Sequence, residues 1–311
     1  EALRQAGFRV IAYENLDILR RDLLARYEEL DGLLFNCFHA ARELGERFPS
    51  LPSLVVPWGV PEASVRAVPE RRDSGPLRLL HVAGWGGVNV RKNSDLVLEA
   101  FDAAGLEDCV LDFYTQAPIE RYGPRGAAIG RQNPSVRLHE GTVEDISGAY
   151  ETADLLLAPS KREGLGLPIL EALASGLPVL ITDGYMMKQW PLPGRHALLC
   201  AATPEVGPNY LPEMRVEPGI LADRLREASA DRQAVAEMRA EVARDRRHWL
   251  WTWQVEVFRQ EIARLAKEPG YRPARDLSYL PAERLAFEEL RLELDGALDT
   301  AASGVSKSES P

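Results

Sequence analysis

The sequence predicts an α/β protein built around a parallel sheet with helices on both faces. Between residues 77 and 200, short apolar runs typical of buried strands alternate with helical stretches. Such alternation indicates parallel strands joined by crossover helices that cover the sheet on both sides. Residues 61–76 collect Pro, Ser, Arg and Asp without an apolar period, which predicts a linker in front of this unit. We therefore expect two domains, with the parallel sheet in the second.

A smaller unit precedes the linker. Two apolar runs, residues 10–13 and 31–36, flank the charged, helix-favouring stretch 17–30, and this pattern indicates a strand, a helix and a strand. A short helix is expected at residues 39–48 and a further strand at residues 53–56. The first unit is therefore also expected to be of the α/β type.

The second unit is where a ligand is expected, because ligands of parallel α/β sheets bind at the carboxyl ends of the strands. Its first helix is expected at residues 94–104, and Gly105 stands where a helix is commonly terminated by glycine. The expected strands cover residues 77–83, 110–114, 136–139, 155–158, 179–182 and 197–200, and further helices lie near 145–152 and from Pro168 onward.

The last third of the chain is expected to be helical, with charged amphipathic stretches at residues 220–229, 232–247 and 249–267. An amphipathic segment, 281–298, precedes a Ser-rich tail, 300–311, that should be disordered. The chain opens with Glu rather than Met, and we expect the true start of the protein to be missing. The expected division is residues 1–60 (the end of an N-terminal domain), 61–76 (linker), 77–267 (second domain with C-terminal helices) and 268–311 (extension and tail).

Composition narrows the function classes. The net charge of −10 comes from acidic residues spread along the chain, which argues against nucleic acid and anionic lipid as partners. The three cysteines lie far apart without C-x-x-C spacing, so neither a disulfide framework nor a zinc site is expected. No apolar run approaches the roughly 20 residues that span a bilayer. We expect a cytoplasmic protein, with peripheral attachment to the inner face of a membrane left open.

The most informative stretch follows the strand expected at residues 155–158. Gly164 and Gly166 let the backbone approach a ligand closely, and Pro168 is expected at the first helical position, where its missing N–H costs nothing. The unpaired N–H groups of the first turn, together with the helix dipole, attract negative charge. This turn is therefore a candidate anion site.

Two carboxylates flank the turn. Glu163 stands before it and Glu171 one turn inside the helix, so a ligand with hydroxyls at both ends and phosphate in the middle fits between them. The alternative is a plain strand-loop-helix corner in which both glutamates are solvated, as most charged side chains are.

The whole string resembles the E-x7-E signature of glycosyltransferase family 4. The resemblance extends over residues 31–265. Residues 31–48 resemble the last strand and helix of the family's acceptor domain, and residues 92–101 resemble the start of a donor-domain helix. The residues that match the signature are Pro159-Ser160, Glu163-Gly164, Gly166-Leu167-Pro168, Glu171-Ala172, Ser175-Gly176 and Pro178-Val179.

The resemblance implies a GT-B fold, in which two Rossmann-like domains face each other, and retaining transfer of a hexose from a nucleotide diphosphate sugar. The chain would then hold a complete, doubly wound donor domain and a truncated acceptor domain, so the isolated chain is expected to be an incomplete enzyme. Glu171 would accept hydrogen bonds from the ribose and Glu163 from the transferred hexose. The implied donor-binding backbone comprises Gly164, Leu165, Gly166 and Leu167 around the diphosphate, and Thr142 and Val143 near the base.

A glycine-rich loop between the expected strand and helix at residues 77–104 supplies the second part of the site. Arg91 and Lys92 at its end can neutralise a diphosphate, and with Glu163 they are the expected catalytic residues. Gly86 and Gly87 are further donor-binding candidates, although glycine turns between strand and helix are also common without function.

Two positions depart from the family pattern. Trp85 stands where the family usually has an Arg, so Arg91 is expected to take that role. Residues 184–190 lack the family's G-G-x-x-E motif; either Tyr185 or Lys188 compensates, or the apolar residues of the segment only pack. These departures support a second hypothesis, a non-catalytic subunit that binds a nucleotide sugar or pairs with an intact transferase.

No metal or other cofactor is expected. The sequence contains no Asp-x-Asp pattern, and the two cations with the helix N–H groups supply the charge that a metal would. The expected partners are a nucleotide-sugar donor and an unidentified glycan, lipid or protein acceptor, and the sequence does not indicate an oligomeric state.

Overall fold

The larger part of the protein is built around a six-stranded sheet. Its strand order is β6-β5-β4-β7-β8-β9, and every neighbouring pair of strands is parallel. This order is the doubly wound arrangement, with its reversal between β4 and β7. It confirms the predicted fold class. The computed structural model describes residues 2–14, 19–35, 44–45, 47–55, 58–66, 75–184, 187–207 and 209–252, with a few residues between 255 and 267. The strands are β4 (Leu77–Gly84), β5 (Cys109–Thr115), β6 (Val136–Glu140), β7 (Leu155–Ala158), β8 (Val179–Thr182) and β9 (Ala197–Cys200).

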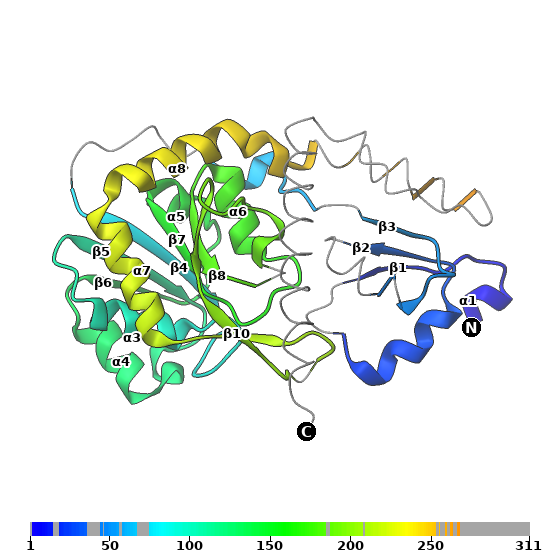
Figure 1. Cartoon of the computed structure of the whole chain (residues 1–311), viewed down its shortest axis with the longest axis horizontal. Coiled ribbons are helices and arrows are strands. Elements are labelled where there is room, and N and C mark those ends of the chain that lie inside the picture. Colours follow the sequence, from blue (N-terminus) through cyan, green and yellow to red (C-terminus); the bar gives the residue numbers. More distant parts are fainter. Residues whose placement is uncertain are drawn as a thin grey trace, which may run out of the picture.

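Helices cover both faces of this sheet (Figure 1). Side chains alternate along a strand, so Leu79 and Leu80 of β4 enter separate cores, each with no exposed surface. The Leu79 core contains apolar residues of α3 and α7, and the Leu80 core those of α5 and α6. As expected, α3 ends at Gly105, which has a φ of 62°. The helices are α3 (Ser94–Ala104), α4 (Gly123–Gln132), α5 (Ser147–Thr152), α6 (Leu167–Ser175), α7 (Pro218–Ala230) and α8 (Arg232–Asp245), with 3-10 turns η4 (Ile119–Tyr122), η5 (Met187–Gln189) and η6 (Arg246–Trp249).

A second, three-stranded parallel sheet in the order β1-β2-β3 lies at the N-terminal side of the molecule (Figure 1). The stretch between β1 and β2 is a 3-10 helix rather than the α-helix that its charged composition favours. Most of the helix expected at residues 39–48 lies outside the described residues. The elements of this part are α1 (Ala2–Gln5), β1 (Ile11–Glu14), η2 (Arg21–Glu29), β2 (Gly32–Phe35), β3 (Ser53–Val55) and η3 (Glu62–Ser64), the last within the expected linker.

The chain after α8 returns to the segment that joins the two sheets. The N–H of Val60 donates to the carbonyl of Trp249 (2.8 Å), and the N–H of Trp251 donates to the carbonyl of Val60 (2.7 Å). A side chain on Gly59 would lie 2.7 Å from the Trp251 backbone, so only glycine permits this approach. The helix expected at residues 249–267 therefore begins later than predicted, because Trp249 ends a 3-10 turn and Leu250 is extended and bridges to Val60. The described residues between 251 and 267 are helical, as expected.

The sequence did not predict helix α4 or the hairpin of β10 and β11. Helix α4 contains three glycines and begins with Gly123-Pro124, so its helical propensity is low. The antiparallel hairpin of β10 (Ala202–Glu205) and β11 (Glu213–Val216) includes a proline and lacks apolar alternation on its exposed first strand. The segments 281–298 and 300–311, for which a helix and disorder were expected, lie outside the described residues.

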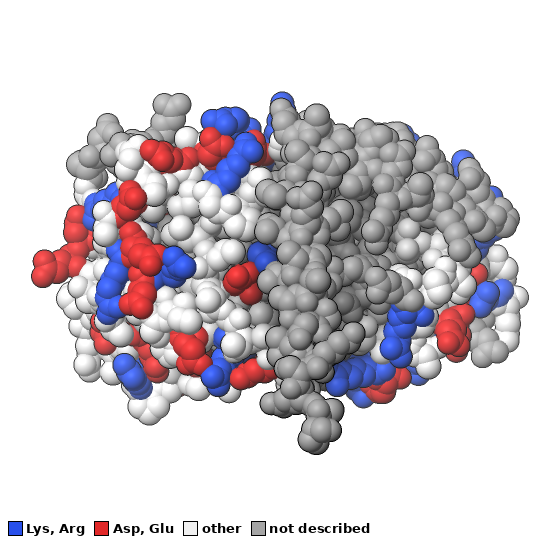
Figure 2. Space-filling model, viewed as in Figure 1, with Lys and Arg blue, Asp and Glu red and all other residues white. Residues whose placement is uncertain are grey.

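Charged side chains of both signs are interspersed over the described part of the surface in Figure 2, without a large area of one sign. This distribution agrees with the expectation that the acidic excess is spread along the chain. Within the described residues, no helix is both long enough and apolar enough to cross a bilayer.

Candidate functional site

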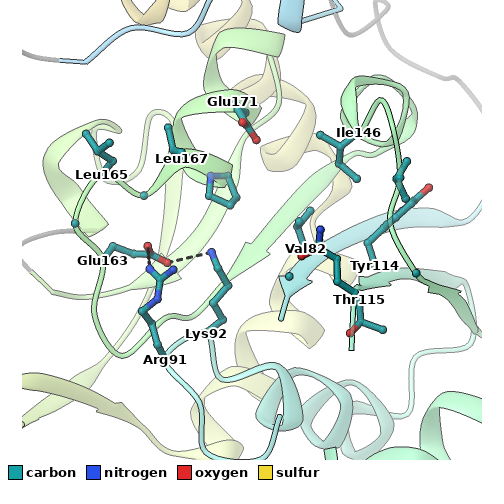
Figure 3. Close-up of a pocket in the computed structure, with 17 residues that line it drawn as sticks. Val82, Arg91, Lys92, Tyr114, Thr115, Ile146, Glu163, Leu165, Leu167 and Glu171 are labelled. Atoms are coloured by element: carbon teal, nitrogen blue, oxygen red, sulfur yellow. Dashed lines mark hydrogen bonds and ion pairs between the residues drawn. The ribbon is translucent and has the colours of Figure 1, made fainter. Parts of the chain in front are cut away.

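A cavity of about 530 Å³ opens at the carboxyl ends of β4 and β7, where the strand order reverses (Figure 3). The ends of β4 and β5, the loop after β6 and the loop from β7 into α6 form its wall. Doubly wound sheets bind ligands at this place, and the volume is in the usual range for small-molecule sites.

The loops on either side of the cavity are joined to each other. The amide of Asn93 donates to the carbonyl oxygen of Pro159 (2.7 Å), and the N–H of Lys161 donates to the carbonyl oxygen of Arg91 (2.7 Å). Asn93 has a left-handed backbone (φ 52°) at the start of α3, a conformation that Asn tolerates better than most residues. These bonds fix the cationic end of the glycine-rich loop against the loop that follows β7.

His81 of β4 links β7 and α3, the two elements that adjoin these loops. Its Nδ1 lies 2.7 Å from the carbonyl oxygen of Leu157 and its Nε2 lies 2.7 Å from Oγ of Ser94. A carbonyl only accepts, so Nδ1 carries the proton and Nε2 accepts from the Ser94 hydroxyl. Burial, together with a smaller effect of the charge of nearby Lys92, lowers the pKa of His81 to about 4. His81 is therefore a neutral structural residue at physiological pH.

The charged end of the cavity is a cluster around Glu163, whose side chain is only 3% exposed. Nη1 of Arg91 lies 2.6 Å from one carboxylate oxygen, and Nζ of Lys92 lies 3.3 Å from the other (Figure 3). The hydroxyl of Ser160 donates to the same oxygen as Lys92 (2.7 Å). Two cations thus face the cavity with a single buried carboxylate between them, leaving a net positive charge for an anionic ligand.

Glu171 lies at the other end of the cavity, on the second turn of α6. The hydroxyl of Tyr150, a buried residue of α5, donates to Oε2 of Glu171 (2.7 Å). Burial raises the pKa of Glu171, whereas the Tyr150 hydrogen bond and the charge of Lys92 act in the opposite direction. Burial and the neighbouring carboxylate raise the pKa of Tyr150 well above its ordinary value, so Tyr150 stays a donor.

Between the two glutamates the turn 164–167 leads into α6. Gly166 has a left-handed backbone (φ 63°), which glycine adopts without strain. The helix starts at Leu167, so Pro168 occupies its second position rather than the expected first, and its missing N–H is still harmless there. Side chains from η5 and Trp190 support the turn from behind: Nε2 of Gln189 and Nε1 of Trp190 donate to its carbonyl oxygens.

Most of the predicted site residues meet in this cavity. In the segment 184–190, Trp190 and Met187 are 2% and 1% exposed and pack in the core, which was one of the two alternatives for this segment. Lys188 of the same segment forms an ion pair with Asp183 (2.9 Å). Tyr185 lies outside the described residues. The predicted residues that line the cavity are Arg91, Lys92, Glu163, Gly164, Leu165, Gly166, Leu167, Glu171 and Val143.

Three predicted residues do not line the cavity. A side chain on Gly86 would lie 2.5 Å from the Tyr122 hydroxyl, and one on Gly87 would lie 3.2 Å from the Arg121 carbonyl oxygen. Both glycines therefore allow the loop to pack against η4, which is a structural reason for them. Thr142 is exposed beside the lining residue Val143.

Other residues of the cavity wall were missed. Val82, Tyr114, Thr115, Gln116 and Ile146 line it at the ends of β4 and β5 and before α5. Ligands of parallel sheets bind at the carboxyl ends of strands, and the strand at residues 110–114 was predicted from the sequence. Applying the rule to this strand would have identified Tyr114 and Gln116 as site candidates. Within the described residues, no group of three or more His, Cys, Asp or Glu side chains is placed to hold a metal ion.

Comparison with known proteins points to one class. Residues 77–206, which include the cavity and its loops, match the family model described as "Glycosyl transferases group 1". The D-inositol 3-phosphate glycosyltransferase of Nocardia farcinica (strain IFM 10152) is 30% identical over 142 residues, which cover 45% of this chain and 26% of that protein.

Solved structures share the fold at low sequence identity. The pneumococcal O-GlcNAc transferase GtfA, solved with UDP and GlcNAc, has a TM-score of 0.60 at 18% identity, covering 80% of this chain and 48% of that chain. Sucrose-phosphate synthase from Thermosynechococcus elongatus has a TM-score of 0.59 at 17% identity (84% and 70% covered). HepE from Anabaena, solved with UDP and glucose, has a TM-score of 0.62 at 14% identity (84% and 72% covered).

The fold of this chain is thus that of GT-B glycosyltransferases, and together with the family-model match it supports a place in the GT-B glycosyltransferase superfamily. The chain spans about half the length of the pneumococcal transferase (48%), and its match covers about a quarter of the Nocardia protein (26%).

Proposed function

We propose that this chain is the donor-binding part of a retaining glycosyltransferase that moves a hexose from a nucleotide diphosphate sugar to an unidentified glycan, lipid or protein acceptor. The observation that carries the proposal is the cluster of Arg91 and Lys92 around buried Glu163, placed next to the glycine turn at the switch point of the sheet. Cations and unpaired helix N–H groups at one wall are what a diphosphate requires. The UDP complexes of the pneumococcal and Anabaena structures are consistent with such a ligand.

In the proposed reaction the diphosphate is the leaving group. Arg91, Lys92 and the N–H groups of the turn 164–167 stabilise the negative charge that develops as the bond to the anomeric carbon breaks, so no divalent metal is needed. The acceptor attacks from the face that the leaving group departs, which retains the anomeric configuration, and the leaving phosphate takes the acceptor proton.

The two glutamates hold opposite ends of the donor in this proposal. Glu171, with one oxygen occupied by Tyr150, accepts from the ribose hydroxyls. Glu163, next to the cations, accepts from hydroxyls of the transferred hexose. The nucleobase then lies toward Val143, Ile146 and Tyr114, where the wall is least charged.

Binding is tested by calorimetric titration of the chain with UDP, GDP, ADP and the corresponding glucose donors, with and without EDTA. We expect one nucleoside diphosphate to bind, with an affinity that the chelator leaves unchanged. Absence of binding by all three would refute the proposal, and a large loss on chelation would refute metal independence.

Transfer is tested on the full gene product, with the anomeric configuration of the product determined by NMR. Tight donor binding without turnover would favour the second hypothesis, a non-catalytic nucleotide-sugar-binding subunit or partner, which keeps support from Trp85 at the position of the family's Arg.

A further inference from the structure

The glycine turn of the cavity is supported by two buried side chains that neither the family resemblance nor the comparisons assign a role. Gln189 and Trp190 are 1% and 2% exposed and do not line the cavity. Nε2 of Gln189 donates to the carbonyl oxygens of Gly164 (3.0 Å) and Leu165 (3.4 Å), and Nε1 of Trp190 donates to that of Leu165 (2.6 Å). The two peptide units that follow Gly164 and Leu165 are therefore fixed from the core side.

Fixing these carbonyl groups also fixes two N–H groups. In a trans peptide unit the C=O of one residue and the N–H of the next point in opposite directions. With the carbonyls of Gly164 and Leu165 turned toward the core, the N–H groups of Leu165 and Gly166 are turned away from it, on residues that line the cavity. Among the described residues, neither N–H is hydrogen-bonded to another part of the protein.

We propose that Gln189 and Trp190 are positioning residues that aim the N–H groups of Leu165 and Gly166 at the distal phosphate of a bound nucleoside diphosphate, opposite Arg91 and Lys92. The inference rests on the proposed function. It gives the segment that departs from the family pattern a role in donor binding without contact to the donor. The support is needed because glycines at 164 and 166 leave the turn free to rotate its peptide units, and fixed donors bind an anion without paying for that ordering.

The test compares a diphosphate with a monophosphate, since only the diphosphate reaches the turn. Gln189→Met keeps the length and apolar packing of the side chain and removes its donor. Titrated with UDP and UMP, the variant should lose about tenfold in UDP affinity while UMP affinity changes less than twofold. Equal losses for UDP and UMP, or no loss for either, would overturn the inference. If the unaltered protein bound none of UDP, GDP and ADP, the proposed function would fail, and the inference with it.

A second pair of variants separates positioning from stability. Trp190→Phe removes the other donor, and Trp249→Phe removes an equally buried indole whose Nε1 donates to the carbonyl oxygen of Trp190 (3.3 Å) rather than to the turn. Both should lower the melting temperature, but only Trp190→Phe should raise the ratio of the UDP to the UMP dissociation constant. An equal change of that ratio in both variants, or no change in Trp190→Phe, would show that these residues serve folding alone.

Discussion

The two glutamates of the cavity are eight positions apart in the sequence but lie in opposite environments. Glu163 is surrounded by charge: two cations and a hydroxyl occupy its oxygens. Glu171 is held by one neutral phenol, Tyr150, and burial raises its pKa. A cationic neighbourhood attracts phosphate, whereas in an apolar neighbourhood each hydrogen bond to the carboxylate is stronger. The same residue type can therefore serve two ends of one ligand.

The largest effect is expected from the cations of the Glu163 end. Lys92→Met removes one charge from the wall while Arg91 and Ser160 still satisfy Glu163, so the fold should persist. Loss of a charged hydrogen bond to phosphate should weaken binding of the nucleoside diphosphate by about 2–3 kcal/mol in calorimetry. Lys161→Met, which removes a half-buried cation that does not line this cavity, is the matched control and should bind normally. A similar loss of affinity in both variants would show that Lys92 attracts the nucleotide only through general electrostatics and does not bind the phosphate directly.

Glu171→Ala should come next. It removes the acceptor for the ribose hydroxyls, so the free nucleoside diphosphate and the nucleotide sugar should both weaken by about 1.5–3 kcal/mol. Glu171→Gln keeps an acceptor for Tyr150 and should lose less. Unchanged affinity for both ligands in Glu171→Ala would return this residue to a structural role beside Tyr150.

Glu163→Ala should affect the free nucleoside diphosphate and the nucleotide sugar differently. It frees Arg91 and Lys92 from their carboxylate, so free nucleoside diphosphate should bind as well as before or more tightly. The intact sugar donor should lose about tenfold, because its hexose hydroxyls lose their acceptor, and turnover of the full gene product should fall further as these contacts tighten in the transition state. Isothermal titration with both ligands decides the matter. Equal weakening of free nucleotide in the Glu163 and Glu171 variants would contradict the assignment of opposite ends.

The smallest effect, and the most diagnostic of the Glu171 end, is expected from Tyr150→Phe. The Tyr150 hydroxyl lowers the raised pKa of Glu171, so its removal should raise that pKa further. Ribose binding needs the ionised carboxylate, so affinity should fall as the pH drops through the pKa of Glu171, and in the variant this fall should begin at a higher pH. Near neutral pH the loss should be only about 0.5–1.5 kcal/mol. Superimposable pH profiles of the two proteins would show that the phenol does not tune the carboxylate.

The same shift has a consequence for stability. Because the pKa of Glu171 is raised in the folded protein, its contribution to stability is largest below the ordinary pKa and is lost as the pH rises through the raised one. Without ligand, thermal unfolding of Glu171→Gln should therefore depend less on pH in this window than that of the unaltered protein.

The turn from β7 into α6 could be predicted because its signals are local. Gly164, Gly166, Pro168 and the two glutamates lie within nine consecutive positions, and each constrains the backbone of its own neighbourhood. The alternation of strands and helices around it is local in the same sense. Helix α4 and the β10–β11 hairpin were missed because their glycines, prolines and polar residues give no such signal, and only packing against the rest of the protein makes them regular.

The sequence by itself therefore determined the parallel α/β architecture, the glycine turn and the presence of two cations and two glutamates near it. The tertiary structure decided which of them meet. Arg91 and Glu163 are 72 positions apart and form an ion pair because β4 lies beside β7, and strand order is set by the packing of both helix layers rather than by any local pattern. The other contacts of the site also depend on tertiary packing. Gly86 and Gly87 pack against η4, and Tyr150 donates a hydrogen bond to Glu171. Gln189 and Trp190 donate hydrogen bonds to the glycine turn from the core side.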